Sequence, residues 1–116
     1  MARITIRIDL GEAAAIGPGK AKLLEEIAEH GSIRGAAAAM GMSYRRAWLL
    51  VQELEAIMGA PVISTSTGGA KGGGARLTKL GASVLKHYRA IERDAHRSAE
   101  RELDALASLA KRKRTR

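Results

Sequence analysis

Polar and apolar residues alternate at the N-terminus. Between residues 3 and 10, one side of an extended chain carries Ile4, Ile6, Ile8 and Leu10, and the other side carries charged or polar residues. A period of two is typical of a half-buried strand. The pattern therefore predicts a strand over residues 3–10. Its partner is either a hairpin further along the chain or a second subunit.

The next three apolar patterns have a period of three to four residues and predict three helices. The helices span residues 20–30, 32–40 and 44–58. Ser32 and Ser43 are suited to cap the second and third helices, because their hydroxyls can accept a backbone N–H of the first turn. The inward faces of these two helices are formed by Ile33, Ala36, Ala37 and Met40, and by Ala47, Val51, Leu54 and Met58.

A short hairpin and one long helix follow. Residues 61–65 and 75–77 are strand-like, and a glycine-rich tip at residues 68–74 separates them. A single helix is predicted from about residue 78 to residue 110. Its apolar stripe includes Leu80, Val84, Tyr88, Ile91, Leu103 and Leu106. Because this stripe extends beyond what a three-helix core can cover, we expect it to form the interface of a homodimer.

This order of elements predicts a winged helix-turn-helix fold, mainly α with a small β wing and a long C-terminal dimerisation helix. A chain of 116 residues is long enough for one domain, which we place at residues 1–110. Five of the last six residues are Lys or Arg, and we expect residues 111–116 to be a disordered basic tail. Two interpretations of this tail are compatible, a solvated chain end and a segment that attracts phosphate groups.

Composition narrows the class of protein. The net charge of +8 favours a polyanionic partner such as nucleic acid, although residues 1–110 carry only 15 basic and 12 acidic residues. The chain has no Cys, which excludes disulfides and thiolate chemistry. No stretch approaches the ~18 apolar residues of a membrane span, and no signal peptide is evident. We therefore expect a cytoplasmic protein without a membrane partner.

The second and third predicted helices have the layout of a helix-turn-helix, whose second helix places its N-terminal side chains in the major groove. Arg can bind guanine in a bidentate manner, Gln suits adenine, and hydroxyl groups suit phosphate oxygens. Arg45 and Arg46 could instead form an ordinary solvated helix face. They lie in the first turn, however, where positive charge opposes the helix dipole unless an anion compensates it. The expected DNA contacts are Ser43, Tyr44, Arg45, Arg46, Leu49 and Gln52, with Lys71 and Arg76 from the wing.

Two stretches resemble a known family. Residues 31–48 read GSIRGAAAAMGMSYRRAW, and residues 67–81 read TGGAKGGGARLTKLG. Together they are similar to the N-terminal DNA-binding domain of molybdate-responsive regulators of the ModE type, and more distantly to LysR-type regulators. The resemblance covers most of residues 17–95. It implies a dimeric winged helix whose recognition helix begins at residues 43–46 and whose wing carries Lys71.

The chain also departs from this family. Full-length relatives continue into oxyanion-binding domains, whereas this sequence continues as a helix and ends in basic residues. We therefore expect no oxyanion effector site on this chain. It is either a stand-alone branch of the family or a truncated regulator.

Other chemistry finds little support in the sequence. The glycine-rich tip lacks the Gly-Lys-Ser/Thr ending of a phosphate-binding loop. His30, His87 and His96 have no metal-ligand spacing and are expected at the surface, and Trp48 is expected to be partly buried. The acidic residues lie mainly in helices, where pairing within the helix explains them. The sequence thus predicts no cofactor, no metal and no enzymatic activity.

Three functions remain in competition. The first is sequence-specific transcription regulation by a DNA-bound dimer. The second is a protein-interaction or antiactivator module built on the same fold. The third is an architectural protein that binds DNA through charge alone.

Overall fold

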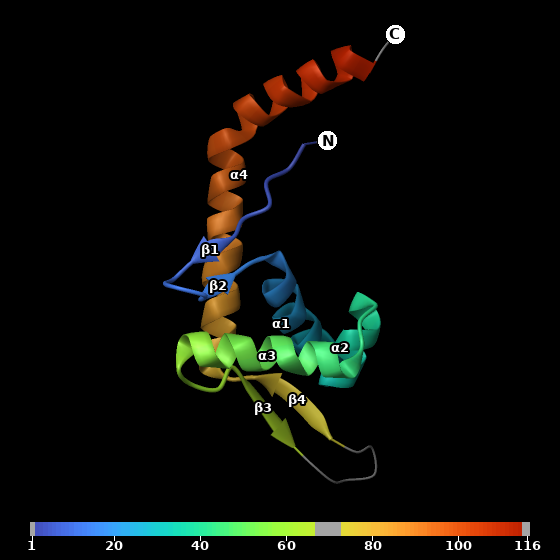
Figure 1. The fold of residues 1–116 in the computed structure, drawn as a ribbon, viewed down its shortest axis with the longest axis vertical. Coiled ribbons are helices and arrows are strands. Elements are labelled where there is room, and N and C mark those ends of the chain that lie inside the picture. The colour runs from blue at the N-terminus through green and yellow to red at the C-terminus, as the bar shows by residue number, and fades with distance from the viewer. Residues whose placement is uncertain (1, 67–72, 115–116) are drawn as a thin grey trace.

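The computed structural model describes residues 2–66 and 73–114. Within these ranges the helices are α1 (Pro18–His30), α2 (Ile33–Met40), α3 (Tyr44–Met58) and α4 (Lys79–Arg114). Strands β1 (Ile8–Asp9) and β2 (Ala15–Ile16) form one antiparallel hairpin, and β3 (Ile63–Ser66) and β4 (Gly74–Leu77) form another. Figure 1 shows α1, α2 and α3 in a small body with the β3–β4 wing at one end, while α4 extends away as a long arm. The predicted winged helix-turn-helix, mainly α with a small β wing, is confirmed.

An apolar core joins the first three helices. Its members are Leu23, Leu24 and Ile27 from α1, Ile33, Ala36 and Ala37 from α2, and Ala47, Val51 and Leu54 from α3. Met40 and Met58 are partly buried against it. These are the inward faces that the helical periodicity predicted for α2 and α3.

The predicted helix caps are also confirmed. The Ser32 hydroxyl accepts a hydrogen bond from the Gly35 N–H at 2.9 Å, and the Ser43 hydroxyl accepts one from the Arg46 N–H at 3.0 Å. The turn between α1 and α2 uses Gly31 at a φ of 72°, a left-handed conformation that glycine adopts without a steric penalty. Side chains and backbone therefore fix the start of each helix of the helix-turn-helix.

The prediction of one strand over residues 3–10 is wrong. Only Ile8 and Asp9 are paired, and their partners are Ile16 and Ala15, not the wing. The turn that follows Asp9 reverses the chain after this short pairing and shortens the strand. The sequence did not predict the partner strand, because Ala15 and Ile16 are too few residues to show a period of two.

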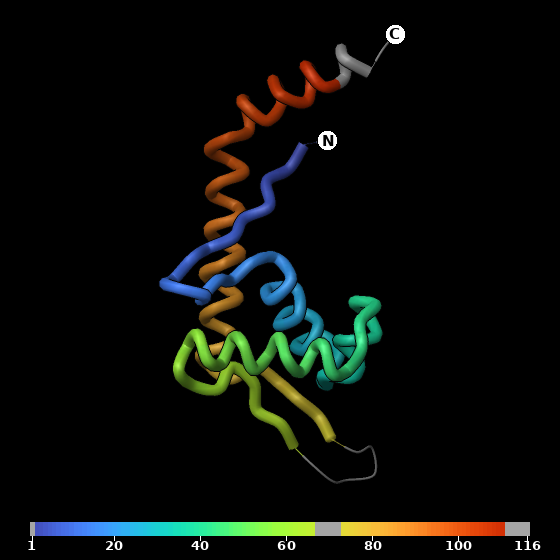
Figure 2. The backbone as a smooth tube through the Cα atoms, viewed as in Figure 1, coloured from blue at the N-terminus to red at the C-terminus, as the bar shows by residue number. Residues whose placement is uncertain are grey.

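Upstream of β1 the chain runs beside α4 (Figure 2). The Ile4 N–H donates to His96 Nε2 at 3.0 Å, and the Tyr88 hydroxyl donates to the Ile6 carbonyl at 2.6 Å. His96 is partly buried by this contact, so its predicted place among the surface residues is wrong. His87, also expected at the surface, is exposed.

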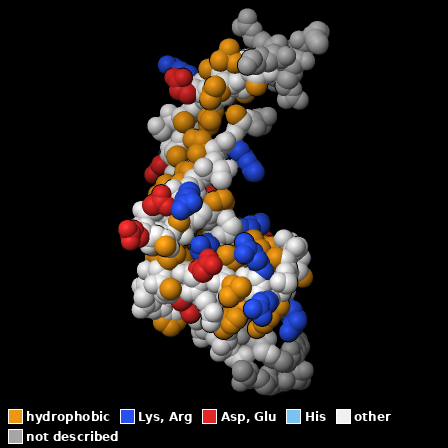
Figure 3. All heavy atoms as spheres, in the orientation of Figure 1, with side chains coloured by type: hydrophobic (Ala, Val, Ile, Leu, Met, Phe, Trp, Pro, Cys, Tyr) orange, Lys and Arg blue, Asp and Glu red, His pale blue; other side chains and the backbone are white. Residues whose placement is uncertain are grey.

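The apolar stripe of α4 is divided between the core and the surface. Tyr88 is only 2 % exposed, and its predicted place in a subunit interface is wrong because the N-terminal segment and the core already cover it. Leu80 and Val84 are partly buried against the same core. Farther along, Ile91 and Leu106 remain exposed. Figure 3 shows hydrophobic side chains in a band along this arm.

The end of α4 lies later than predicted. The helix continues to Arg114, four residues into the segment 111–116 that was expected to be disordered. Lys and Arg have good helix propensity, and positive charge near a helix C-terminus interacts favourably with the helix dipole. Composition alone therefore misplaced this boundary.

We predict that Gly81→Ala destabilises the fold. A Cβ atom at this position would collide with the Val62 carbonyl oxygen, which accepts the Thr78 N–H. We expect a loss of about 1–3 kcal/mol in the free energy of unfolding, the usual cost of forcing extra volume into a packed site. The control is Gly19→Ala, since a Cβ there meets nothing within 4 Å and alanine favours a helix. Urea unfolding measures both variants, and equal stability of the two would contradict the prediction.

Candidate nucleic-acid interface

The first turn of α3 exposes two arginines. Arg45 and Arg46 are both exposed, and within the described part of the chain neither forms an ion pair. The turn contains no acidic residue, and its only side-chain cap is the Ser43 hydroxyl. Positive charge at a helix N-terminus is unfavourable unless an anion binds there. This turn is therefore well suited to contact an anionic partner.

The outward face of α3 continues this surface. Tyr44, Leu49 and Gln52 are exposed, as predicted for residues opposite the buried stripe. Trp48 is 37 % exposed and belongs to the surface as much as to the packing that was expected of it. The surface therefore combines cations, an amide and apolar groups, which are the groups that can distinguish base edges in a major groove.

Helix α2 adds an arginine that sequence reasoning missed. The Arg34 guanidinium lies over the Tyr44 ring, with its central carbon 4.9 Å from the ring centroid. This cation–π contact links the first turns of α2 and α3. The inward positions of Ile33, Ala36 and Ala37 already required Arg34 to face outward, so the helical periodicity contained the signal. Figure 3 shows Lys and Arg side chains gathered over this part of the body.

A hollow of about 290 Å³ lies between these helices and the wing. Its lining includes Ser32, Arg34, Tyr44, Trp48, Thr65 and Ser66. Hydroxyl groups and a guanidinium are the side chains that commonly contact DNA phosphates. Sequence reasoning did not identify Thr65 and Ser66, because only the register of the hairpin places them opposite α2.

The wing is attached to the helices at two points. The Ala75 N–H donates to the Gly31 carbonyl at 2.8 Å, which joins β4 to the α1–α2 turn. The Glu55 carboxylate of α3 accepts the Val62 N–H at 2.9 Å, at the start of the wing. The acidic residues were expected to pair within their own helices, but Glu55 instead binds the backbone of the wing.

One of the two predicted wing contacts, Arg76, lies among the described residues. Arg76 is exposed on β4, and the register pairs it with Ser64 on β3. Lys71 lies outside the described residues. The structure thus brings Ser43, Tyr44, Arg45 and Arg46 together in one turn, with Leu49 and Gln52 along the same helix.

Comparison with known proteins identifies the family. Residues 19–82 match the family described as bacterial regulatory helix-turn-helix protein, lysR family. The chain belongs to this family. Its members are DNA-binding regulators and not enzymes. The matched segment contains α1, α2, α3 and the wing, so the basic surface of α3 lies on the family's defining unit.

The chain is similar both to a transcriptional regulator and to a molybdenum-pterin-binding protein. Transcriptional regulator ModE of Haemophilus influenzae is 37 % identical over 90 residues, which cover 78 % of this chain and 35 % of the relative. Molybdenum-pterin-binding protein MopB of Rhodobacter capsulatus is 42 % identical over 79 residues, which cover 68 % of this chain and 29 % of the relative. The chain thus spans about a third of the length of these relatives. The similarity to the ModE type that the sequence indicated is confirmed.

A solved structure agrees with the same fold. The protein chain in the crystal structure of the CbnR_DBD-DNA complex has a TM-score of 0.59 and 27 % identity. The match covers 76 % of this chain and 95 % of that one. Within the residues that the structure describes, no helix has the length and apolar character needed to cross a membrane. No cluster of metal-binding side chains occurs in the same ranges.

We predict that Glu55→Ala loosens the wing. The variant leaves the buried Val62 N–H without its acceptor, which should cost about 1–3 kcal/mol in the free energy of unfolding. The matched control is Glu53→Ala on the same helix, because the Glu53 side chain is 58 % exposed in its pair with Lys20 and its loss should cost at most about 1 kcal/mol. Amide hydrogen exchange at Val62 reports the local effect. Unchanged exchange at Val62 in Glu55→Ala would contradict this assignment.

Proposed function

We propose that this chain is the DNA-reading part of a dimeric transcription regulator and binds a specific duplex sequence. The observation that carries the proposal is the first turn of α3, where Arg45 and Arg46 are exposed and unpaired among the described residues, next to Tyr44 at the hollow between the helices and the wing. In a helix-turn-helix this turn enters the major groove. A regulator of this kind acts on DNA in the cytoplasm.

Each part of the surface has a role in the proposal. Arg45 and Arg46 read base edges or adjacent phosphates, and Leu49 and Gln52 continue the contact along the groove. Tyr44 and Ser43 stand at the phosphate backbone, where hydroxyl groups serve as ligands. The wing, with Arg76 and the sequence-predicted Lys71, follows the backbone or the minor groove. The CbnR_DBD-DNA complex and the ModE regulators support a DNA partner.

The dimer rests on the exposed apolar residues of α4 from Ile91 onward. Ile91, Leu106 and Leu109 are 44 %, 63 % and 55 % exposed, and Leu103 is partly buried. A row of exposed large apolar side chains on one helix is costly in water and marks a surface that another chain covers. We propose that a second copy of α4 covers these residues. Leu80 and Val84 would then contribute only through the parts that the core leaves uncovered.

Competing functions make different predictions for DNA. A protein-interaction module would keep the fold and bind no duplex tightly. An architectural protein would bind every duplex with similar affinity, because phosphate contacts carry no sequence information. Specificity at the α3 surface separates the proposed function from both.

The test of the DNA proposal uses a duplex selected from a random pool and a scrambled duplex of equal length. Arg45→Ala or Arg46→Ala should cost about 1–3 kcal/mol on the selected duplex and much less on the scrambled one. Arg101→Ala, an exposed arginine on α4, is the matched control. Deleting residues 111–116 should weaken both duplexes and reduce the slope of log affinity against log salt by roughly 0.9 for each phosphate group that the chain no longer binds. Equal weakening on both duplexes from the α3 variants would exclude α3 as the reading element.

The test of the dimer uses the double variant Ile91→Asp, Leu106→Asp. Carboxylates in the proposed interface should dissociate the dimer, because burying an unpaired charge is highly unfavourable. Sedimentation velocity at micromolar concentration measures the mass, and circular dichroism verifies that α4 stays helical. Arg101→Asp on the polar side of the same helix should leave the dimer intact. A parent chain that sediments as a folded monomer would exclude the dimer.

A further inference from the structure

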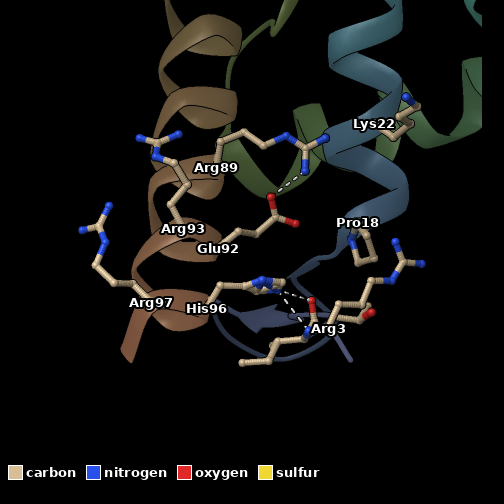
Figure 4. Close-up of a pocket in the computed structure, with 10 residues that line it drawn as sticks. Arg3, Pro18, Lys22, Arg89, Glu92, Arg93, His96 and Arg97 are labelled. Atoms are coloured by element: carbon tan, nitrogen blue, oxygen red, sulfur yellow. Dashed lines mark hydrogen bonds and ion pairs between the residues drawn. The ribbon is translucent and has the colours of Figure 1, made fainter. Parts of the chain in front are cut away.

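A second basic surface lies away from the helix-turn-helix. It is a groove of about 750 Å³ between the N-terminal segment, the start of α1 and the middle of α4. Figure 4 shows Arg89 reaching from α4 toward α1 near Glu92, while Arg3 and Pro18 lie on the other side. None of the residues proposed for DNA binding through α3 or for dimerisation through α4 lines this groove.

Charges on the floor of the groove are balanced within the chain. The Arg89 guanidinium is paired with Glu92 at 2.6 Å and with Glu25 at 3.1 Å. Lys22, on the α1 side, is paired with Glu26 at 2.9 Å. The pair with Glu25 joins α4 to α1, and together the pairs leave little net charge on the floor.

The rim of the groove carries positive charge with little compensation. Arg3, Arg93 and Arg97 line it and are exposed. Among the described residues Arg3 and Arg93 form no ion pair, and Arg97 has only a 3.8 Å contact with Asp94 in which both side chains are 77 % exposed. Such an exposed pair contributes little. Three guanidinium groups thus surround the groove. Among the described residues that line it, the carboxylate is that of Glu92, and it is already paired with Arg89.

This arrangement depends on the packing of the N-terminus. Arg3 is distant from the other two arginines in sequence, and the hydrogen bond from the Ile4 N–H to His96 brings it to the groove. His96 lies between Arg93 and Arg97 on α4, so this contact brings Arg3 to the two arginines that the helix already carries. The contact that partly buries His96, which the sequence did not predict, therefore holds Arg3 at the groove.

We propose that this groove binds a small anion that carries two or more phosphate groups. A planar guanidinium group can donate two parallel hydrogen bonds to the oxygens of a phosphate. Three guanidinium groups carry more positive charge than a ligand with a single negative charge would need. The volume lies within the range of about 300–1,000 Å³ that is common for small-molecule sites. The sequence led us to expect no oxyanion effector site, because no oxyanion-binding domain follows α4. For this groove, which lies within the described fold, the proposal replaces that expectation.

The position of the groove favours a small ligand over the DNA backbone. Pro18, at the N-terminal end of α1, lines the groove, whereas Gly31 after the other end of α1 holds the wing. The 13 residues of α1 separate the two surfaces by about 20 Å at 1.5 Å per residue. A duplex seated on α3 and the wing therefore leaves the groove open for a second ligand.

The test is isothermal titration of the full chain with pyrophosphate, ATP and inorganic phosphate at about 0.15 M salt, where long-range attraction between exposed charges is largely screened. We expect one site per chain for pyrophosphate and ATP, and at least tenfold weaker binding of inorganic phosphate. The double variant Arg3→Ala, Arg93→Ala should weaken pyrophosphate binding at least tenfold, since removing a charged hydrogen bond has a large effect. Circular dichroism verifies that this variant is folded. Arg101→Ala, which removes an equivalent exposed charge from α4 outside the groove, should bind pyrophosphate like the parent.

Three results would overturn the proposal. The first is the absence of pyrophosphate binding up to millimolar concentration. The second is an equally large decrease in Arg101→Ala, which would reflect general charge attraction. The third is a decrease in affinity for the selected DNA duplex in the groove variant as large as that in Arg45→Ala, which would assign the groove to the DNA backbone. Because Arg45→Ala should keep pyrophosphate binding intact, failure of the DNA proposal and failure of this one are distinguishable.

Discussion

The close approach of three helices over small side chains is the constraint on which the rest of this structure depends. Ala36, Ala37 and Ala47 are at most 2 % exposed, and they lie where α2 meets α1 and α3. A larger side chain at any of these positions would separate the helices, because protein cores have no room for added volume. This packing turns the first turn of α3 outward and presents Arg45 and Arg46 together.

The wing depends on the same helices, because its strands pair with each other only over residues 63–66 and 74–77, too few for independent stability. The Gly31 carbonyl and the Glu55 carboxylate attach it by accepting N–H groups from the two sides of the hairpin, so α3 and the wing act on a partner as one surface.

Local signals in the sequence predicted most of the helical body. The spacing of Ile33, Ala36 and Ala37 and the caps Ser32 and Ser43 involve residues within one or two turns of each other, so they can be read from the sequence. The same reasoning placed the outward face of α3 correctly. The same periodicity implies an outward Arg34, but its stacking on Tyr44 depends on the angle between two helices.

Long-range contacts account for what the sequence did not predict. Tyr88 bonds to Ile6 across 82 residues, and His96 bonds to Ile4 across 92 residues. No periodicity connects positions so distant, and a tyrosine on an apolar stripe fits a subunit interface as well as a core. The N-terminal segment thus covered part of the stripe that the sequence assigned to a second subunit. The same segment created the basic groove beside α4.

The central claim, that paired α3 helices read DNA, is tested most directly by a hydroxyl-radical footprint of the full chain on its selected duplex. A dimer with one reading helix per subunit should protect two short stretches whose centres are about one helical turn, roughly 10–10.5 base pairs, or a multiple of it apart. Protection spread evenly over selected and scrambled duplexes alike would contradict the claim. The absence of any protection at concentrations where the chain is folded and dimeric would contradict it as well.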